Sequence, residues 1–276
     1  MTASMPPPAS GAVPSFRHVV AARYITPLRE GGSVPALVEA DDGQAYVVKL
    51  RGAGQGARVL IAELIAGQLG RALGLDVPEL TSVQLDLALA RTEPDSEVQD
   101  ILRASVGVNL GLRHLDGAVT FDPAARPGPG GAIASAIVAL DSFTTNVDRT
   151  ARNPNLLWWR GLLAPIDHGA ALYWQHDWSG AVADANPARR FPLIRQHVLL
   201  PWADQLGAAG ERLAETLTDG LIAAVTSQLP DAWLAPLPAA PTPEAQREAY
   251  AEWLRQRRAE LPQLMEEAAR ARASGV

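Results

Sequence analysis

Residues 146–169 read NVDRTARNPNLLWWRGLLAPIDHG, and the pattern inside this stretch decides the fold. Two apolar runs, Leu156–Trp159 and Leu162–Ile166, flank the dipeptide Arg160-Gly161. Glycine supplies the positive φ that a two-residue hairpin turn needs, so the two runs are expected to pair as antiparallel strands. The residues before the first run are mostly polar. The stretch therefore predicts a polar loop followed by a short β-hairpin.

Polar side chains stand at both open ends of this hairpin. An antiparallel pair brings its open ends together, so Asn155, just before the first strand, and Asp167, just after the second, are expected side by side. Two oxygen donors at one place suit Mg²⁺, which prefers oxygen ligands and shares its shell with water and phosphates. Asp148, seven residues before Asn155, can reach the same place and accept a proton from an attacking hydroxyl. The pattern therefore predicts a metal and proton-transfer site at this end of the hairpin.

The only lysine of the chain is a second informative feature. Lys49 stands against 23 arginines, at the end of the apolar run AYVVK. The strand-like run Ala45–Leu50, which contains this lysine, and the run Pro35–Val38 flank Asp41-Asp42-Gly43, a turn sequence typical of a hairpin. A chain that otherwise uses arginine keeps one compact ammonium at a strand end, where it can contact phosphates. Together with the hairpin at 156–166, this lysine predicts a nucleotide site.

A helix is expected to follow the strand that ends at Lys49. Over Ala57–Leu73 the apolar residues fall at helical spacing, and Gly74 ends the pattern. Glu63 lies in this helix and is the expected ion-pair partner of Lys49. Upstream of the strands, the small-residue segment Glu30-Gly31-Gly32-Ser33 can fold over a ligand. Gly31, Gly32 and Ser33 are therefore expected beside the nucleotide.

Strand patterns dominate the first part of the chain and helical patterns the second. The expected elements are a strand at 82–90, helices at 94–105 and 132–143, mostly helical structure from 189 onward, and a charged helix at 243–260. This separation predicts an α+β fold with two lobes and a cleft between them. We expect a disordered lead-in over residues 1–15, a nucleotide-binding N-lobe over 16–112 and a mainly helical C-lobe over 113–276.

Composition limits the class of protein. A length of 276 residues with 47% hydrophobic and 20% charged residues is typical of a globular protein with a sizeable core. The net charge of −6 gives no general attraction to nucleic acid or to an anionic membrane, so neither is an expected partner. Without cysteine, thiolate chemistry and cysteine-based metal sites are excluded. Neither a signal-peptide pattern nor an apolar run of membrane-spanning length is present, so we expect a cytoplasmic protein.

The stretch NVDRTARNPNLLWWRGLLAPIDHGAAL resembles the HipA-like kinases, above all their short stand-alone members. More distantly, its order DR…N…IDxG resembles the phosphatidylinositol kinases and the protein kinases. The segment AYVVKL…AELIAGQLGRALGLDVPEL is similar to the strand-lysine, helix-glutamate and GL-x-VP pattern of the same family. The resemblance covers residues 30–175 and implies a bilobal, protein-kinase-like fold.

Carried over by position, the resemblance also implies roles for individual residues. Asp148 becomes the catalytic base and Asp167 the metal-binding aspartate, while Lys49 becomes the phosphate-binding lysine with Glu63 as its partner. ATP and Mg²⁺ are the implied substrate and cofactor.

Three departures from the kinase pattern matter. Protein kinases have their metal-binding asparagine five residues after the base, which points to Asn153, whereas the apolar strand begins only after Asn155. We favour Asn155, because the strand context fixes its position, and keep Asn153 as the second candidate. His168 stands where many kinases have phenylalanine, so the switch built on that aromatic ring is not expected. The chain is also too short for the extra N-terminal subdomain of full-length HipA toxins, so their antitoxin and DNA association is not assumed.

The expected function is Mg²⁺-dependent transfer of the γ-phosphoryl group of ATP to a hydroxyl acceptor. Serine or threonine of a protein is the preferred acceptor, the protein itself included. One alternative is a lipid or small-molecule kinase of the same fold, which would differ in the acceptor groove beside Asp148. Another is a kinase-like module that binds a nucleotide without turnover, against which the intact pair Asp148 and Asp167 argues.

Overall fold

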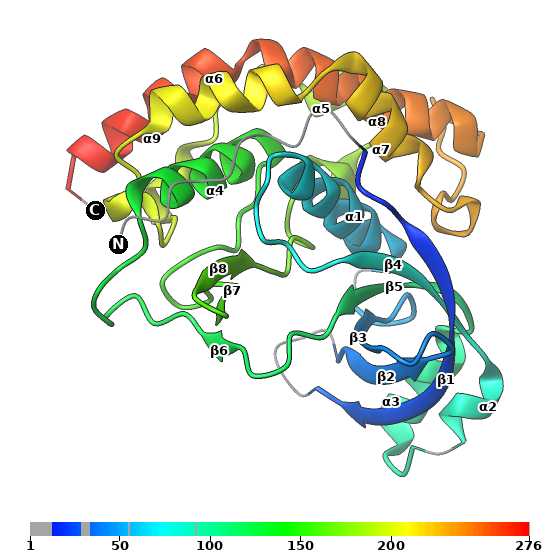
Figure 1. Cartoon of the computed structure of the whole chain (residues 1–276). Coiled ribbons are helices and arrows are strands. Elements are labelled where there is room, and N and C mark those ends of the chain that lie inside the picture. The colour runs from blue at the N-terminus through cyan, green and yellow to red at the C-terminus, as the bar shows by residue number, and fades with distance from the viewer. Residues whose placement is uncertain (1–12, 29–33, 55, 92, 276) are drawn as a thin grey trace.

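The computed structural model describes residues 13–28, 34–54, 56–91 and 93–275. Within these ranges the chain combines β-strands, mostly in its first part, with helices that dominate its second part (Figure 1). The fold is therefore of mixed α and β content, as the sequence predicts. The expected loop residues Gly31, Gly32 and Ser33 lie outside the described residues.

Five strands in the first part of the chain close into a barrel (Figure 1). In order around the barrel they are β1 (Arg17–Pro27), β2 (Ala36–Ala40), β3 (Ala45–Lys49), β5 (Gly107–Arg113) and β4 (Leu80–Leu85). β1 runs parallel to β4, and every other neighbouring pair is antiparallel. Val38, Tyr46 and Val48 are fully buried in its core. Closure pairs the strand edges with one another, so the barrel is a rigid base for the residue at the end of β3.

The hairpin of β2 and β3 positions Lys49. Its turn uses Gly43 at φ 73°, and the N–H of Gly43 donates to the carbonyl of Ala40 at 3.0 Å. Lys49 is the last residue of β3 and stands opposite Leu110 of β5. Because β3 has neighbours on both sides, the backbone that carries Lys49 is held by two strands.

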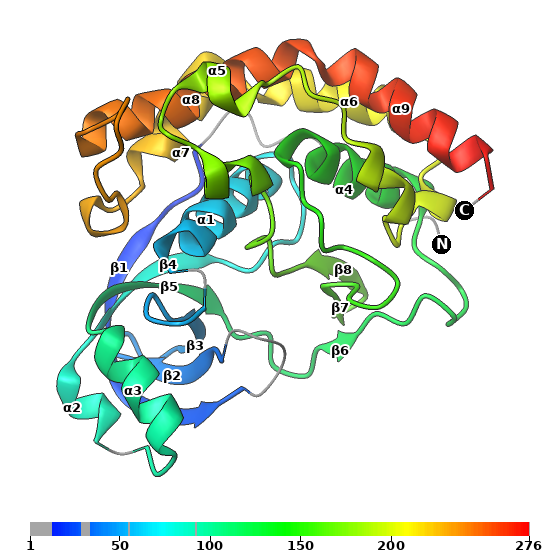
Figure 2. The same ribbon diagram turned by 180° about the vertical axis from the view of Figure 1, so that it is seen from behind.

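Helix α1 (Ala57–Ala72) packs on the barrel strands β4 and β5 and on the helices α4 (Gly131–Thr144) and α7 (Asp219–Ser227) (Figures 1 and 2). Its close approach to β4 depends on a small residue, because a Cβ at Gly67 would lie 2.6 Å from Cδ1 of Leu80. The larger hydrophobic core contains buried residues from α1, β4, β5 and the helices of the second part. One core thus joins the two predicted lobes.

The segment after β4 corrects one sequence prediction. The strand expected at 82–90 ends at Leu85, and the residues after it form the short helix α2 (Leu87–Ala90). The carboxylate of Asp86 accepts the backbone N–H of Ala88, and such a cap starts a helix where the apolar pattern alone favours a strand. The expected helix at 94–105 is α3 (Ser96–Ala104), which is capped in the same way by Asp95.

A second, three-stranded sheet lies apart from the barrel, below α4 in Figure 1. It consists of β6 (Val119–Thr120), β7 (Leu156–Trp159) and β8 (Leu162–Pro165). β7 and β8 form the predicted hairpin, and its turn residues Arg160 and Gly161 have φ values of 51° and 79°. The apolar helix expected at 132–143 is α4, which is buried from Ala134 to its end.

The second part of the chain is helical, as expected. Besides α4 and α7, its helices are α5 (Val182–Ala185), α6 (Leu206–Thr216), α8 (Pro243–Ala259) and α9 (Leu261–Ala273), with 3₁₀ turns at Tyr173–Asp177, Pro192–Gln196, Leu200–Trp202 and Asp231–Trp233. α6, α8 and α9 form an outer layer over α4 and α1 (Figures 1 and 2). None of the helices in the described ranges has both the length and the apolar character needed to cross a membrane.

Candidate active site

The ammonium group of Lys49 lies between two carboxylates. Its Nζ is 2.6 Å from Oε2 of Glu63 and 2.5 Å from Oδ1 of Asp167. Burial by itself lowers the pKa of Lys49, but the charges of Glu63 and Asp167 outweigh it and hold that pKa above its ordinary value. The lysine is therefore charged, and it joins β3, α1 and the segment after β8.

Glu63 is fully buried and is bound from two sides. Lys49 contacts one of its oxygens, and Nδ1 of His168 lies 3.4 Å from the other, Oε1. Burial raises the pKa of Glu63, but Lys49 and His168 outweigh it and hold the pKa well below its usual range. Because an ionised carboxylate only accepts hydrogen bonds, Nδ1 of His168 carries the proton in this contact.

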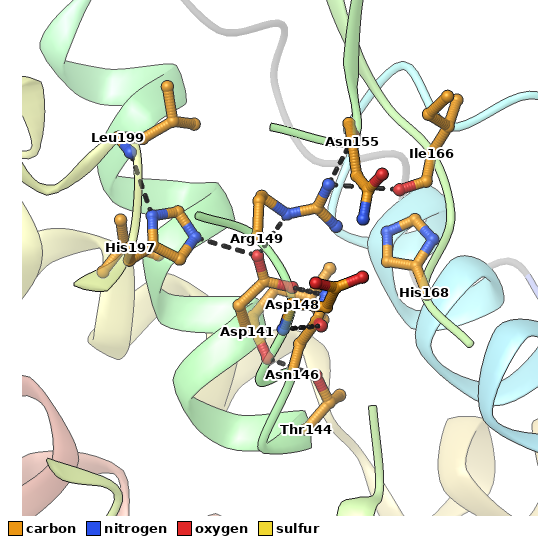
Figure 3. Close-up of polar contacts among 12 residues, drawn as sticks. Asp141, Thr144, Asn146, Asp148, Arg149, Asn155, Ile166, His168, His197 and Leu199 are labelled. Carbon is orange, nitrogen blue, oxygen red and sulfur yellow. Dashed lines mark hydrogen bonds and ion pairs between the residues drawn. The ribbon is translucent and has the colours of Figure 1, made fainter. Parts of the chain in front are cut away.

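Asp148 is held by its own loop, which follows α4. The N–H of Asp148 donates to Oδ1 of Asn146 at 3.2 Å (Figure 3). Nδ2 of Asn153 donates to Oδ2 of Asp148 at 2.7 Å. Its other oxygen, Oδ1, accepts no hydrogen bond from the described residues. The carboxylate is half-buried, so one oxygen remains open to an incoming proton.

The base of the hairpin brings together the residues that the sequence places there. The N–H of Ile166 donates to the carbonyl of Asn155 at 3.0 Å, so Asn155 lies beside the residue that precedes Asp167. Asn155 and Asp167 both have a φ of 51°, in the left-handed region. Asparagine and aspartate tolerate that region better than other residues with a side chain, so the sequence suits this backbone.

Oxygen ligands for a divalent cation are available at this base. Oδ2 of Asp167, whose side chain is 43% exposed, carries no hydrogen bond from the described residues. The side-chain amide of Asn155 is likewise without a partner there, and its Nδ2 is buried. Asn153 uses Nδ2 on Asp148 and keeps its own Oδ1 available. One carboxylate and one amide oxygen fit Mg²⁺, which usually takes its other ligands from water and phosphates.

Near the site, Asp141 and His197 escaped the sequence reasoning, and Arg149 entered it only as part of the DR…N…IDxG order, without a role. Asp141, Arg149 and His197 are buried and joined by hydrogen bonds (Figure 3). A signal existed for Asp141, because it is the only charged residue in the apolar helix α4, and a charge at such a position needs a buried partner. Nothing in the local sequence marks His197.

Comparisons with known proteins give matches in two of three cases. No curated protein matches the chain in sequence. Among solved structures, the chain is similar to the crystal structure of the Golgi casein kinase with Mn/ADP bound, with a TM-score of 0.46 and 11% identity over 96% of this chain and 74% of that one. A second crystal structure of the Golgi casein kinase has a TM-score of 0.44 and 12% identity over 92% of this chain and 73% of that one. Both scores are low, and neither likeness assigns a function.

The family comparison is decisive for the chain as a whole. A family described as HipA-like kinase matches residues 22–257, a range that contains Lys49, Glu63, Asp148 and Asp167. The match extends well beyond the segment over which the motifs alone resemble that family, and it covers most of the 276 residues. The chain therefore belongs to the HipA-like kinase family.

Proposed function

We propose that this protein is an ATP-dependent and Mg²⁺-dependent kinase that transfers the γ-phosphoryl group to a hydroxyl acceptor. Serine or threonine of a protein is the preferred acceptor. The observation that carries the proposal is the position of Lys49, whose ammonium joins Glu63 of α1 to Asp167 after β8. A lysine at a strand end that pairs with a glutamate of the next helix and lies beside an aspartate matches the phosphate-binding lysine, its glutamate partner and the metal-binding aspartate of protein kinases.

The proposed fold is bilobal and protein-kinase-like. The barrel, α1, α2 and α3 form the N-lobe over residues 16–112, and the hairpin of β7 and β8 with the remaining helices forms the C-lobe over 113–276. In this arrangement Lys49 and Glu63 belong to the N-lobe, and Asp148 and Asp167 belong to the C-lobe. The contact between Lys49 and Asp167 then closes the site between the lobes.

Each site residue has a proposed task. Lys49 binds phosphate oxygens, and Glu63 keeps it in position. The free carboxylate oxygen of Asp148 orients the acceptor hydroxyl and takes its proton. Asp167 and Asn155 hold the metal, with Asn153 as the alternative to Asn155; Mg²⁺ neutralises charge on the phosphate oxygens when it is bound.

The proposed transfer balances in bonds and protons. A bond forms between the acceptor oxygen and the γ-phosphorus, while the bond from that phosphorus to the bridging oxygen of ADP breaks. ADP leaves with the electron pair of the broken bond. The proton of the acceptor hydroxyl moves to Asp148, whose Oδ1 has no hydrogen-bond donor among the described residues.

The test is incubation of the purified protein with γ-labelled ATP, Mg²⁺ and a cell extract, followed by mass spectrometry of new phosphosites. The Asp148→Asn variant serves as the matched control. The proposal is supported if the wild type labels serine or threonine and the Asp148→Asn variant does not. Label found only in extracted lipids or small molecules would replace the acceptor class, and ATP binding without any labelled product would reduce the protein to a nucleotide-binding module.

A further inference from the structure

Arg149, the residue after Asp148, connects the catalytic loop to both ends of the hairpin. Its side chain is fully buried. Nη1 donates to the carbonyl of Asn155 at 2.5 Å and to the carbonyl of Ile166 at 3.1 Å (Figure 3). The first carbonyl belongs to one proposed metal ligand, and the second lies in the peptide bond that leads into Asp167. One nitrogen atom thus fixes the backbone spacing between the two ligands.

The contacts of Nη1 with these two carbonyls form a clamp beside two left-handed residues. Asn155 and Asp167 both have a φ of 51°, which asparagine and aspartate tolerate better than other residues with a side chain but which still costs some free energy. Arg149 binds the carbonyl of Asn155 itself and the carbonyl of Ile166, the residue just before Asp167, so both contacts lie next to a left-handed residue. The guanidinium is therefore placed to impose the conformation from which the ligands project.

Asp141 of α4 anchors the guanidinium. Its Oδ2 accepts from Nε of Arg149 at 2.5 Å and from Nε2 of His197 at 2.9 Å. Its Oδ1 accepts from Nδ2 of Asn146 at 3.1 Å, and Oδ1 of Asn146 accepts the N–H of Asp148. A single carboxylate on a buried helix therefore holds both the clamp and the loop that carries the proposed base.

His197 completes the anchor from a distant part of the chain. The N–H of Leu199 donates to Nδ1 of His197 at 3.1 Å, so Nδ1 is unprotonated and the proton lies on Nε2, facing Asp141. The backbone adds a second link, because the N–H of Val198 donates to the carbonyl of Arg149 at 3.0 Å. The segment around His197 thus holds both the side chain of Asp141 and the backbone of Arg149.

We propose that Asp141, Arg149 and His197 form a buried positioning unit that fixes the hairpin ends carrying Asn155 and Asp167 relative to the loop carrying Asp148. The role rests on the proposed function, because it sets the geometry of the metal ligands. All three are positioning residues, since each acts through the backbone or the side chain of another residue. Mg²⁺ demands near-ideal octahedral geometry, so a loose hairpin base is expected to impair metal-dependent binding first.

Arg149→Lys tests the clamp. Lysine keeps the charge beside Asp141 but lacks the planar fork, so it cannot hold Asp141 and both carbonyls at once. ATP affinity is measured by calorimetry with and without Mg²⁺. We expect Mg²⁺ to tighten binding about tenfold or more in the wild type and about twofold or less in Arg149→Lys, with unchanged metal-free affinity.

Arg257→Lys is the matched control. Arg257 is also a buried arginine whose guanidinium donates to backbone carbonyls, those of Ser142, Phe143, Pro187 and Arg189. It touches none of the proposed ligands. Arg257→Lys should lower the free energy of unfolding, but Mg²⁺ should still tighten ATP binding by the folded protein as much as in the wild type. Equal loss of enhancement in both variants would overturn the positioning role.

Amide hydrogen exchange gives a readout without metal or nucleotide. Arg149→Lys should accelerate exchange in the hairpin 156–165 about tenfold or more while α8 stays within about twofold of the wild type. Acceleration spread evenly over the chain would show that Arg149 serves global stability alone. This measurement also separates the two proposals: a wild type that binds no ATP ends the proposed function, whereas the exchange result still decides the clamp.

A second variant covers the case in which Arg149→Lys does not fold. The double variant Asp141→Asn/Arg149→Gln removes both charges together, so neither remains buried without its partner. Glutamine is too short to span both carbonyls. A folded double variant that keeps the full Mg²⁺ enhancement would overturn the proposal, and one that folds but loses the enhancement supports it.

Discussion

Lys49 and Asp167, which are 118 residues apart in sequence, share an ion pair of 2.5 Å. The same ammonium contacts Glu63 at 2.6 Å, so two of its three N–H donors already face carboxylates before any phosphate arrives. Under the proposed function, phosphates and a cation must take over the contact between Lys49 and Asp167 while the contact between Lys49 and Glu63 remains.

Lys49→Arg should lower activity about tenfold or more, equal to at least ~1.4 kcal/mol of transition-state stabilisation. The guanidinium is a wide planar fork, and the space at Lys49 is shaped for a compact ammonium between two carboxylates. Single-turnover rates measure the effect, with folding checked by circular dichroism. Arg23→Lys, in an exposed pair with Glu39, controls for the exchange of cation type and should leave the rate unchanged. Equal rates for wild type and Lys49→Arg would show that this lysine has no special role.

Asp148→Asn should abolish transfer and leave ATP binding largely intact. Asparagine keeps the size of the side chain and can still contact Asn153, but it lacks the carboxylate that takes the proton. Turnover and ATP affinity are measured on the same preparation. A variant that turns over like the wild type would exclude Asp148 as the base.

Asn155→Ala should weaken Mg²⁺-dependent ATP binding more than Asn153→Ala does. The amide of Asn155 has no partner among the described residues, whereas Asn153 already donates to Asp148. Calorimetry across a range of Mg²⁺ concentrations compares the two variants. The reverse order would assign the metal to Asn153, in line with the spacing found in protein kinases.

The hairpins and the longer helices were predictable because their signals are local. Gly43 and Gly161 mark tight turns between apolar runs, and the spacing of Leu60, Leu64 and Leu69 marks α1. These features need only a few neighbouring residues. The pairing of Lys49 with Glu63 was predictable for the same reason, since a strand end and the next helix meet in space.

The remaining contacts depend on tertiary packing. His197 and Asp141 are 56 residues apart, and no pattern near His197 indicates its partner. The parallel pairing of β1 with β4 that closes the barrel is equally non-local.

The wrong prediction of a strand at 82–90 has a local cause, because the side chain of Asp86 caps a helix within an apolar run that favours a strand. A single polar side chain there outweighs the pattern.

His168→Phe should reduce kcat/KM for ATP about tenfold, because Glu63 loses the hydrogen-bond donor on the oxygen that Lys49 does not use. His168→Asn should restore much of the loss, since its Nδ2 can replace Nδ1 as the donor. Steady-state kinetics with ATP as the varied substrate separates KM from kcat. If phenylalanine supports wild-type kinetics, the contact of His168 with Glu63 has no part in positioning Lys49.

The pH dependence of stability should depend on His197. Burial lowers its pKa below the ordinary 6.5; Asp141 acts in the opposite direction, and Arg149 lowers the pKa further. As the pH falls below about 6.5, the unfolded chain therefore takes up a proton before the folded one does. The stabilisation is fully present above that pH and is lost as the pH decreases, by at most about 1.4 kcal/mol per pH unit for one proton.

The test compares the free energy of unfolding of wild type and His197→Gln by urea denaturation between pH 8 and pH 5. The variant should be less stable at pH 8, because glutamine restores only part of the contact with Asp141, and its stability should fall less steeply below pH 6.5. His176 also has a lowered pKa, caused first by burial and then by Arg58, and it contributes a slope of the same sign. The variant His176→Gln therefore measures separately how much His176 contributes to the loss of stability at low pH. Parallel curves for wild type and His197→Gln would show that His197 titrates alike in the folded and unfolded chain, contrary to its buried, neutral place beside Asp141.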